Sequence, residues 1–213
     1  SVTTTDNDTA GFTIAQSGGS TSVSESGTTD TFTIVLNAQP SSNVVFSIAS
    51  SDTGEATVIS TLEFTASNWN SAQTVTLTGV DDNIIDGTQN STTTVSIIDA
   101  ITDDAFDGVA DQTVSVTTTD NDTAGFTITQ SGGSTSVAET GTTDTFTVVL
   151  NAQPASNVVI SVTSGDTGEA TVSPATLTFT SGNWNSAQTV TVTGANDTIT
   201  VSYTHLRAHE TSL

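Results

Sequence analysis

The side chains in this sequence that could do chemistry are carboxylates, and they recur in short polar segments between Thr-rich stretches. These segments read SVSESG, SSDTGEA, GVDDNIIDG and TTTDNDT. Carboxylate oxygens are the ligands that hard divalent cations such as Ca²⁺ prefer. A pair of carboxyl groups can also act as acid and base in glycoside hydrolysis. The candidate ligands in the four segments are Glu25, Asp52, Asp81, Asp82, Asp86, Asp120 and Asp122.

Basic residues cannot balance these acids, because residues 1–200 contain no Lys, Arg or His, and the formal net charge is −22. This charge excludes nucleic acid and anionic membrane as partners, since both are bound through Lys and Arg. The lack of His, Lys and Arg also excludes His-dependent catalytic triads and phosphate-binding loops. Three interpretations of the acidity remain, namely disorder, adaptation to high salt, and the binding of metal cations.

An internal repeat organises the chain. The string SVTTTDNDTAGF begins at Ser1 and again at Ser115, an offset of 115 − 1 = 114 residues, and the match ends after Ile199. We therefore expect four parts. They are residues 1–8, the last strand of a preceding repeat; residues 9–122, a complete repeat; residues 123–199, the first five strands of a second repeat; and residues 200–213, a non-native tail.

The tail differs from the repeats in composition, because it holds the only Arg, the only Tyr and both His residues. Residues 201–211, VSYTHLRAHET, resemble the translation of a sequencing adapter, which implies that the chain is a metagenomic fragment. We exclude the tail from the fold prediction. This also sets aside His205 and His209, whose four-residue spacing could otherwise suggest a metal pair on a helix.

Apolar residues alternate with Thr and Ser along the first repeat, which is typical of half-buried strands. Seven strands are expected, at FTI from Phe12, DTFTIVL, NVVFSIAS, LEF from Leu62, QTVTLTG, TTVSIID and QTVSVTTT. Seven short strands in one repeat predict an all-β fold, an immunoglobulin-like antiparallel β-sandwich per repeat. Trp69 lies just before the fifth strand. We expect it to have a structural role, with sugar stacking as the alternative.

Strand direction predicts where the acids meet. Successive strands in such a sandwich mostly alternate in direction, so the chain leaves the first, third, fifth and seventh strands at the same end. Each of these four exits carries carboxylate. Like charges this close repel by about 1–4 kcal/mol per pair at effective dielectrics of 80 to 20. A Ca²⁺ ion with six to eight oxygen ligands would relieve this repulsion better than Mg²⁺, which retains its waters.

The pattern resembles the Calx-beta domain over the length of each repeat, in SVSESGTTDTFTIVL, TVTLTGVDDNIIDG and TTTDND. The resemblance implies calcium ligands at the seven acids named above. The sequence departs from the family pattern at Asp86, where the family more often has Glu, and at Asn121, which interrupts the final acidic cluster. These departures leave the number of ions open. In the second repeat, the implied ligands are Glu139, Asp166 and Asp197, while Asn196 stands in place of Asp81.

These observations predict a calcium-stiffened structural repeat of a large extracellular bacterial adhesin or surface protein, whose partners are the neighbouring repeats of the same chain. The alternative is a carbohydrate- or cell-surface-binding module. We expect no enzyme activity, because acids that recur with the domain are typical of a structural device. The second repeat should be poorly ordered, since its sheet edges lack partners.

Overall fold

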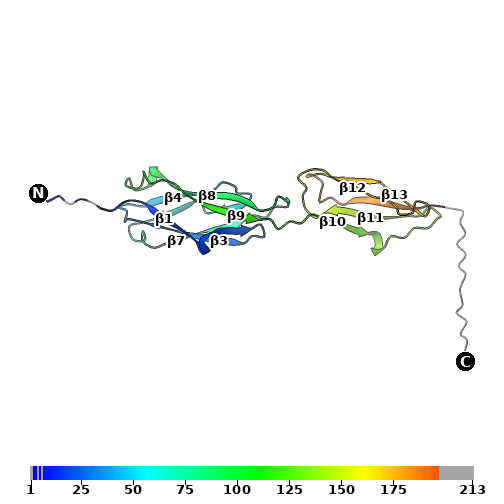
Figure 1. The fold of residues 1–213 in the computed structure, drawn as a ribbon, viewed down its shortest axis with the longest axis horizontal. Coiled ribbons are helices and arrows are strands. Elements are labelled where there is room, and N and C mark those ends of the chain that lie inside the picture. The colour runs from blue at the N-terminus through cyan, green and yellow to red at the C-terminus, as the bar shows by residue number, and fades with distance from the viewer. Residues whose placement is uncertain (1, 4, 6, 197–213) are drawn as a thin grey trace, which may run out of the picture. The chain divides into compact units, whose positions relative to one another are not determined.

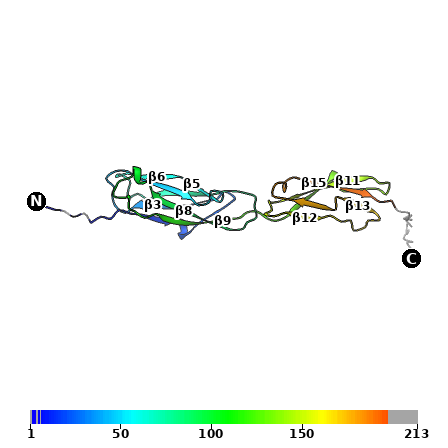
Figure 2. The ribbon, with the colours of Figure 1, turned by 90° about the horizontal axis from the view of Figure 1, so that it is seen from above.

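The computed structural model describes residues 2, 3, 5 and 7–196, which fall into two compact units. Unit 1 spans Ser1–Thr123 and unit 2 spans Ala124–Leu213. Unit 1 is coloured blue to green in Figure 1 and unit 2 yellow to orange, and Figure 2 shows the same ribbon from above. Both units are built from β-sheets whose strands pair almost entirely antiparallel, which confirms the predicted all-β sandwich class.

Unit 1 is a sandwich of two sheets. The first sheet contains, in spatial order, β1 (Phe12–Gln16), β3 (Thr29–Leu36), β7 (Gln73–Gly79) and β5 (Ala56–Val58). The second contains β2 (Thr21–Ser24), β9 (Gln112–Thr119), β8 (Gln89–Ile97), β4 (Val44–Ser50) and β6 (Thr61–Phe64). Neighbouring strands run antiparallel except β2 and β9, which are parallel.

The described part of unit 1 has nine strands where the alternation predicts seven. The strand predicted from Phe12 corresponds to β1, and after the turn Ser17–Gly19 the chain forms the additional strand β2, which lies in the other sheet. Gly18 and Gly19 allow this turn because their φ angles, 61° and 83°, cost glycine no steric strain. Strand β5 is the other addition, and its three residues are too few for an alternating pattern to reveal.

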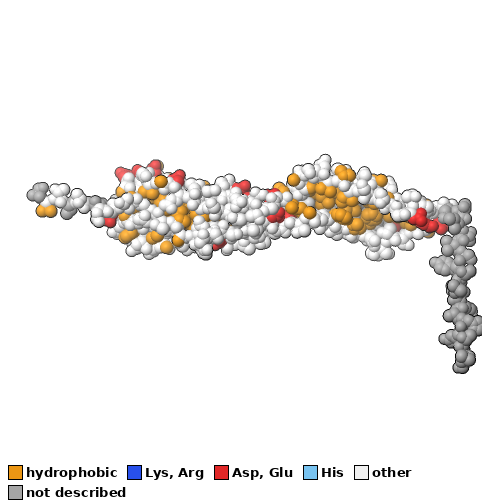
Figure 3. Space-filling model, viewed as in Figure 1, with side chains coloured by type: hydrophobic (Ala, Val, Ile, Leu, Met, Phe, Trp, Pro, Cys, Tyr) orange, Lys and Arg blue, Asp and Glu red, His pale blue; other side chains and the backbone are white. Residues whose placement is uncertain are grey.

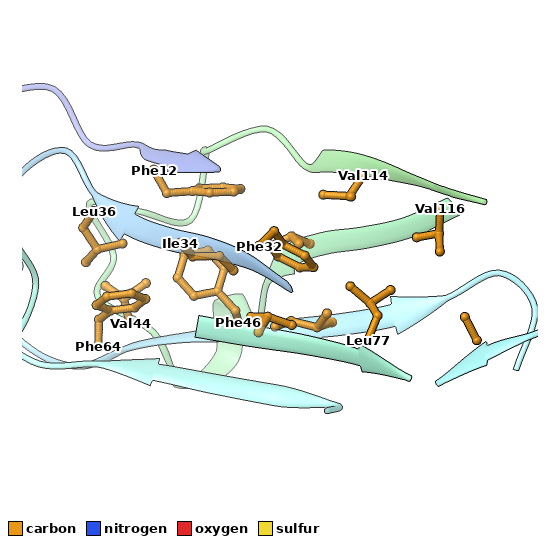
Figure 4. Close-up of a cluster of buried hydrophobic side chains, with 14 of the residues drawn as sticks. Phe12, Phe32, Ile34, Leu36, Val44, Phe46, Phe64, Leu77, Val114 and Val116 are labelled. Carbon is orange, nitrogen blue, oxygen red and sulfur yellow. The ribbon is translucent and has the colours of Figure 1, made fainter. Parts of the chain in front are cut away.

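The inward-facing residues of the two sheets form one apolar core, shown in Figure 4. Phe46 lies at its centre, with ring centroids 4.9 Å from Phe12 and 5.9 Å from Phe64, both in edge-to-face arrangements. Trp69 packs against the same core, and its carbonyl accepts a hydrogen bond from the Leu36 N–H at 3.1 Å. These contacts match the structural role expected for this tryptophan.

Unit 2 repeats part of this architecture. One sheet contains β10 (Phe126–Gln130), β11 (Thr143–Leu150), β15 (Gln188–Gly194) and β13 (Ala170–Ser173), and a second contains β12 (Val158–Ser161) and β14 (Thr176–Phe179). The residues described for this unit include no counterpart of β8 or β9. Figure 3 shows apolar side chains exposed on one face of unit 2. Among the apolar residues of this unit, Phe126 is 51% exposed, while its counterpart Phe12 in unit 1 is 4% exposed.

Poor order of the second repeat in solution stays a prediction. The residues 201–211 that resemble an adapter lie outside the described part of the chain. Within the described part, no helix is long and apolar enough to span a membrane.

Candidate metal centre

Four chain segments bring carboxylates to one end of unit 1, here called the acidic end. Glu25 directly follows β2, and Asp120 and Asp122 follow β9. The other two segments are the β4–β5 turn, with Asp52 and Glu55, and the β7–β8 connection, with Asp81, Asp82 and Asp86. In the space-filling view, acidic side chains gather toward the ends of unit 1 (Figure 3).

A close backbone approach fixes two of these segments against each other. At Gly79, the last residue of β7, an added Cβ would lie 2.0 Å from the carbonyl oxygen of Ser24. Only glycine permits such contact, so β7 and β2 can end side by side. Because Glu25 follows Ser24 and the acidic β7–β8 connection follows Gly79, this approach holds their carboxylates close together.

Two sets of three carboxylates lie within metal-binding distance of one another. The first set is Glu25, Asp120 and Asp122, and the second is Glu25, Glu55 and Asp82. Within each set, one carboxylate oxygen from every residue lies within 4.8 Å of the others. Glu25 belongs to both sets, so its carboxylate lies between Asp120 and Asp122 on one side and Glu55 and Asp82 on the other.

The central acids are buried, and burial is the main cause of their altered proton affinity. Glu25 is 1% exposed and Glu55 is 8% exposed. Loss of hydration raises the pKa of Glu25, with further increases from Asp120, Asp82 and Asp86, against a hydrogen bond from Asn121 that lowers it. Loss of hydration also raises the pKa of Glu55, followed by repulsion from Asp86 and Glu25.

Asp120 and Asp122 are separated only by Asn121 but have opposite pKa shifts. Asp120 accepts backbone N–H bonds from Asp122 at 2.6 Å and Gly87 at 2.8 Å, and these bonds lower its pKa. Burial raises the pKa of Asp122, and repulsion from Asp120 and Asp81 adds to this increase. Asp120 is thus held as a charged carboxylate by the backbone, while Asp122 lacks such support.

Several buried carboxylate oxygens at the acidic end have no hydrogen-bond partner. They are Oε1 of Glu25, Oε2 of Glu55 and Oδ2 of Asp122. An unpartnered buried polar atom is destabilising by about 1–3 kcal/mol, and more when it is charged. The only basic side chains of the chain are Arg207, His205 and His209, far along the sequence. The three residues are divided between the two carboxylate sets, and hard divalent cations bound at these sets would supply partners for such oxygens, so the donor chemistry fits ions of this kind.

Asn121, which interrupts the expected acidic cluster, links two of the acids instead. Its backbone N–H donates to Oε2 of Glu25 at 3.3 Å, and its Nδ2 donates to Oδ1 of Asp81 at 2.9 Å. The amide therefore orients the carboxylates on either side of it without adding another negative charge.

The remaining predicted ligands of unit 1 lie around the two sets. Asp52 and Asp86 are exposed and lie near enough to raise the pKa of Glu55 by repulsion. Asp82 accepts the Ile84 N–H at 2.7 Å, and Asp52 accepts the Gly54 N–H at 2.9 Å, so each carboxylate is oriented by its own turn.

Glu55 is a member of the site that the sequence interpretation omits. It lies in a turn that also contains Asp52, and the prediction took Asp52 as the acid of that segment. One signal was available, since the string DTGEA occurs in both repeats, at residues 52–56 and 166–170. A repeated turn with two acids could have pointed to Glu55.

The predicted ligands of unit 2 do not form an equivalent set among its described residues. Glu139 and Asp166 are exposed, and so is Glu169, the counterpart of Glu55. Both carboxylate sets found within residues 2–196 belong to unit 1. The physical reason is that the acids after β9, which complete the site in unit 1, have no counterpart in the described part of unit 2. Asp197 lies outside the described residues.

At the opposite end of unit 1, Asp103 shows how the same fold uses a carboxylate structurally. Its Oδ2 accepts bonds from the backbone N–H groups of Ser41 and Ser42 and from the Ser41 hydroxyl, all at 2.7 Å. Its Oδ1 accepts the Ala105 N–H at 3.0 Å. These bonds, the Ser41 hydroxyl first, lower the pKa of Asp103 to about 2. Unlike Glu25, this acid is fully supplied with donors.

No family model and no curated protein match this chain. Among solved structures, it is similar to the CBD12 region of CALX1.2, with 14% identity, 87% of this chain and 76% of that chain covered, and a TM-score of 0.35. It is also similar to domains 5–6 of the S-layer protein SbsC, with 20% identity, 89% of this chain and 86% of that chain covered, and a TM-score of 0.35. A third similar structure is the E. coli chaperone DraB, with 6% identity, 88% of each chain covered and a TM-score of 0.38. Because these TM-scores lie below 0.5, the likenesses give no information on what this chain binds.

Proposed function

We propose that the acidic end of unit 1 binds Ca²⁺ and that bound Ca²⁺ stabilises the domain. The main support for this proposal is that Glu25 and Glu55 are buried carboxylates with unpartnered oxygens, in a domain that has no Lys or Arg to neutralise them. Leaving two such groups charged and unpaired inside a protein is strongly destabilising. A bound cation removes this penalty and supplies partners for the open oxygens.

The donor chemistry favours Ca²⁺ over other metals. The site offers carboxylate oxygens only, which disfavours Zn²⁺ and copper, since those ions prefer nitrogen and sulfur ligands. Ca²⁺ accepts six to eight oxygens in flexible geometry, whereas Mg²⁺ needs a near-ideal octahedron and few protein carboxylates. The many acids on four separate connections suit the larger ion. Because Glu25 belongs to both carboxylate sets, the acidic end has room for more than one Ca²⁺.

The physiological role that follows is structural. A tandem, acidic, cysteine-free β-sandwich with a calcium-dependent end serves as a stiff spacer in an extracellular surface protein or adhesin, as its resemblance to Calx-beta repeats implies. Asp120 and Asp122 belong to the last residues of unit 1, directly before the start of unit 2 at Ala124. A cation bound to them would order the segment where one repeat ends, and no catalysis is involved.

The test is thermal unfolding of the full chain with Ca²⁺ and with chelator. At a Ca²⁺ concentration one hundred times the Kd, the added stability is about 2.7 kcal/mol, which corresponds to a Tm increase of about 10 °C for the unit 1 transition. Glu55→Gln should reduce this increase, while the exposed Asp104→Asn at the other end should not. An identical Tm in Ca²⁺ and chelator, with no heat of binding by titration calorimetry, would contradict the proposal.

Stiffening is tested separately, by small-angle scattering of the full chain in Ca²⁺ and in chelator. We expect a narrower distribution of particle dimensions in Ca²⁺. If calorimetry detects binding but the scattering curves coincide, Ca²⁺ stabilises the domain without stiffening the chain.

A further inference from the structure

Asp81 is an acid of the acidic end that belongs to neither carboxylate set, although its neighbours do. The next residue, Asp82, is a member of the second set. Asp81 also lies near the first set, because its repulsion adds to the increase that burial causes in the pKa of Asp122. Its place outside both sets therefore needs a local cause.

The side chain of Asn121 supplies that cause. Its Nδ2 donates a hydrogen bond to Oδ1 of Asp81 at 2.9 Å. A charged carboxylate only accepts hydrogen bonds, so the amide must face Asp81 with its nitrogen. Because the acceptor is charged, this bond is stronger than one between neutral groups. The other side chains assigned to the acidic end are carboxylates, which repel Asp81.

The backbone around Asn121 gives the amide a defined direction. Oδ1 of Asp120 accepts the Asp122 N–H at 2.6 Å, which closes a turn around Asn121. The Asn121 N–H donates to Oε2 of Glu25 at 3.3 Å. Asn121 thus contacts Glu25, the shared member of both sets, through its backbone and the exposed Asp81 through its side chain.

We propose that Asn121 is a positioning residue that holds Asp81 outside both carboxylate sets and so limits the number of Ca²⁺ ions bound at the acidic end. The inference rests on the proposed calcium function and concerns the ion number at that same site. The amide N–H takes the place of a cation beside Asp81. A carboxylate at position 121 would do the opposite, because it would repel Asp81 and offer oxygen ligands next to it. A further Ca²⁺ would then bind between residues 81 and 121.

The same contact matters when no ion is bound. The two sets together contain five carboxylates, and residues 1–200 include no Lys, Arg or His to balance them. A neutral donor at position 121 relieves the repulsion on Asp81 without an ion, whereas an acid there would increase it. Asn121 therefore favours stability at low calcium over the binding of a further ion.

Titration calorimetry of the full chain tests the ion number in wild type, Asn121→Asp, Asp81→Asn and the double variant. Asn121→Asp should bind one more Ca²⁺ per chain than wild type. Asp81→Asn should leave the wild-type number unchanged, because Asp81 is not a ligand while the amide holds it. In the Asn121→Asp background, Asp81→Asn should remove the additional ion.

Thermal unfolding in chelator is the second measurement. Asn121→Asp should lower the Tm of unit 1, since a like charge replaces the donor to Asp81. Asn121→Ala, which removes the donor without adding a charge, should lower the Tm less and gain no ion. Asn70→Asp is the matched control, because Asn70 is exposed before the start of β7, at the opposite end of unit 1. It should leave the ion number unchanged and the Tm close to that of wild type.

The outcomes separate this inference from the proposed function. If wild type binds no Ca²⁺, the proposed function fails and the inference fails with it. If wild type binds Ca²⁺ and Asn121→Asp binds the same number of ions, the inference alone is overturned. If Asp81→Asn lowers the wild-type ion number, Asp81 is already a ligand and the inference is again overturned, and this comparison holds even where Asn121→Asp fails to fold.

Discussion

Glu25 combines two properties that rarely persist together in a folded domain, a carboxylate that is 1% exposed and an Oε1 atom with no partner. Its other oxygen accepts a single N–H at 3.3 Å, from Asn121. Replacing the carboxylate by an amide removes the buried charge while keeping the shape. Glu25→Gln should therefore raise the Tm of unit 1 in chelator and greatly reduce the further increase caused by Ca²⁺.

Differential scanning calorimetry of wild type and Glu25→Gln, each with Ca²⁺ and with chelator, measures both effects. Asp104→Asn is the matched control, because Asp104 is exposed at the opposite end of the domain. A variant whose calcium-dependent Tm shift equals that of wild type would place the ion away from Glu25.

The pKa shifts predict how stability without calcium depends on pH. The folded-state pKa values of Glu25, Glu55 and Asp122 are raised, so these groups bind protons more tightly in the folded chain than in the unfolded one. Their contribution to the free energy of unfolding therefore grows as the pH falls from neutral through the raised pKa values. We expect the Tm in chelator to rise on mild acidification, as followed by circular dichroism.

Asp103 limits the pH range over which the Tm rises, because its pKa is lowered to about 2 from an ordinary 3.8. Its stabilising contribution is present above the ordinary value and is lost as the pH falls toward 2. In Ca²⁺, protons and the ion compete for the same carboxylates, so the Tm gain from Ca²⁺ should shrink as the pH falls. A Tm in chelator that falls steadily from neutral pH would contradict the assigned shifts.

At the scale of elements, the end of β7 depends on Gly79. A methyl group there would lie 2.0 Å from the Ser24 carbonyl oxygen, a distance at which the backbone must move. Gly79→Ala should destabilise unit 1 by about 3 kcal/mol or more, in the range of strongly overpacked sites. It should also weaken calcium binding, since the displaced ends of β2 and β7 carry Glu25 and the β7–β8 acids.

Denaturant unfolding and calcium titration of Gly79→Ala check both consequences. Gly108→Ala is the control, because a Cβ at that position meets nothing within 4 Å. A loss of stability with unchanged calcium affinity would show that the close approach supports the fold without positioning the site.

Asp103 fixes the position of the β8–β9 connection, as Gly79 fixes the end of β7. Three bonds from Ser41 and Ser42 tie this connection to the turn before β4, and a bond from the Ala105 N–H holds Asp103 within the connection itself. Asp103→Ala leaves those donors without a partner and should destabilise unit 1 by about 2–4 kcal/mol. Chemical denaturation measures the loss, and the exposed Asp104→Ala should stay within about 0.5 kcal/mol of wild type.

The alternating pattern was sufficient to predict the sandwich and to direct four acidic connections to one end. It could not predict that β1 and β2 lie in different sheets, because residue alternation is the same on both sides of the glycine turn. It also missed Glu55, which lies directly before β5, a strand of only three residues that the pattern did not reveal. For Glu139 and Asp166 the family resemblance implied ligands from their positions in the repeat, whereas the site of unit 1 also contains the acids that follow β9.

At the scale of the whole chain, the two units differ in how completely their cores are covered. Phe12 and Phe126 occupy the same position in the repeat, yet their exposed fractions are 4% and 51%. Ile128 and Val159 of unit 2 are also more than half exposed. Because β-sheet cores are stabilised by the strands that cover them, unit 2 should open at lower temperature and more often than unit 1.

Chymotrypsin distinguishes the units directly, because it cleaves after aromatic residues. Phe126 is accessible in unit 2, whereas Phe32, Phe46 and Phe64 are fully buried in unit 1. Brief digestion of the full chain in Ca²⁺ should therefore cleave unit 2 first and leave a resistant fragment that ends near Phe126, identified by its intact mass. Chelator should shorten the lifetime of this fragment, since unit 1 then loses the stability that the ion supplies. Equal cleavage rates in the two units would mean that the exposed face of unit 2 is covered in solution, and Phe126→Ser, which removes the first site, would then leave the rate unchanged.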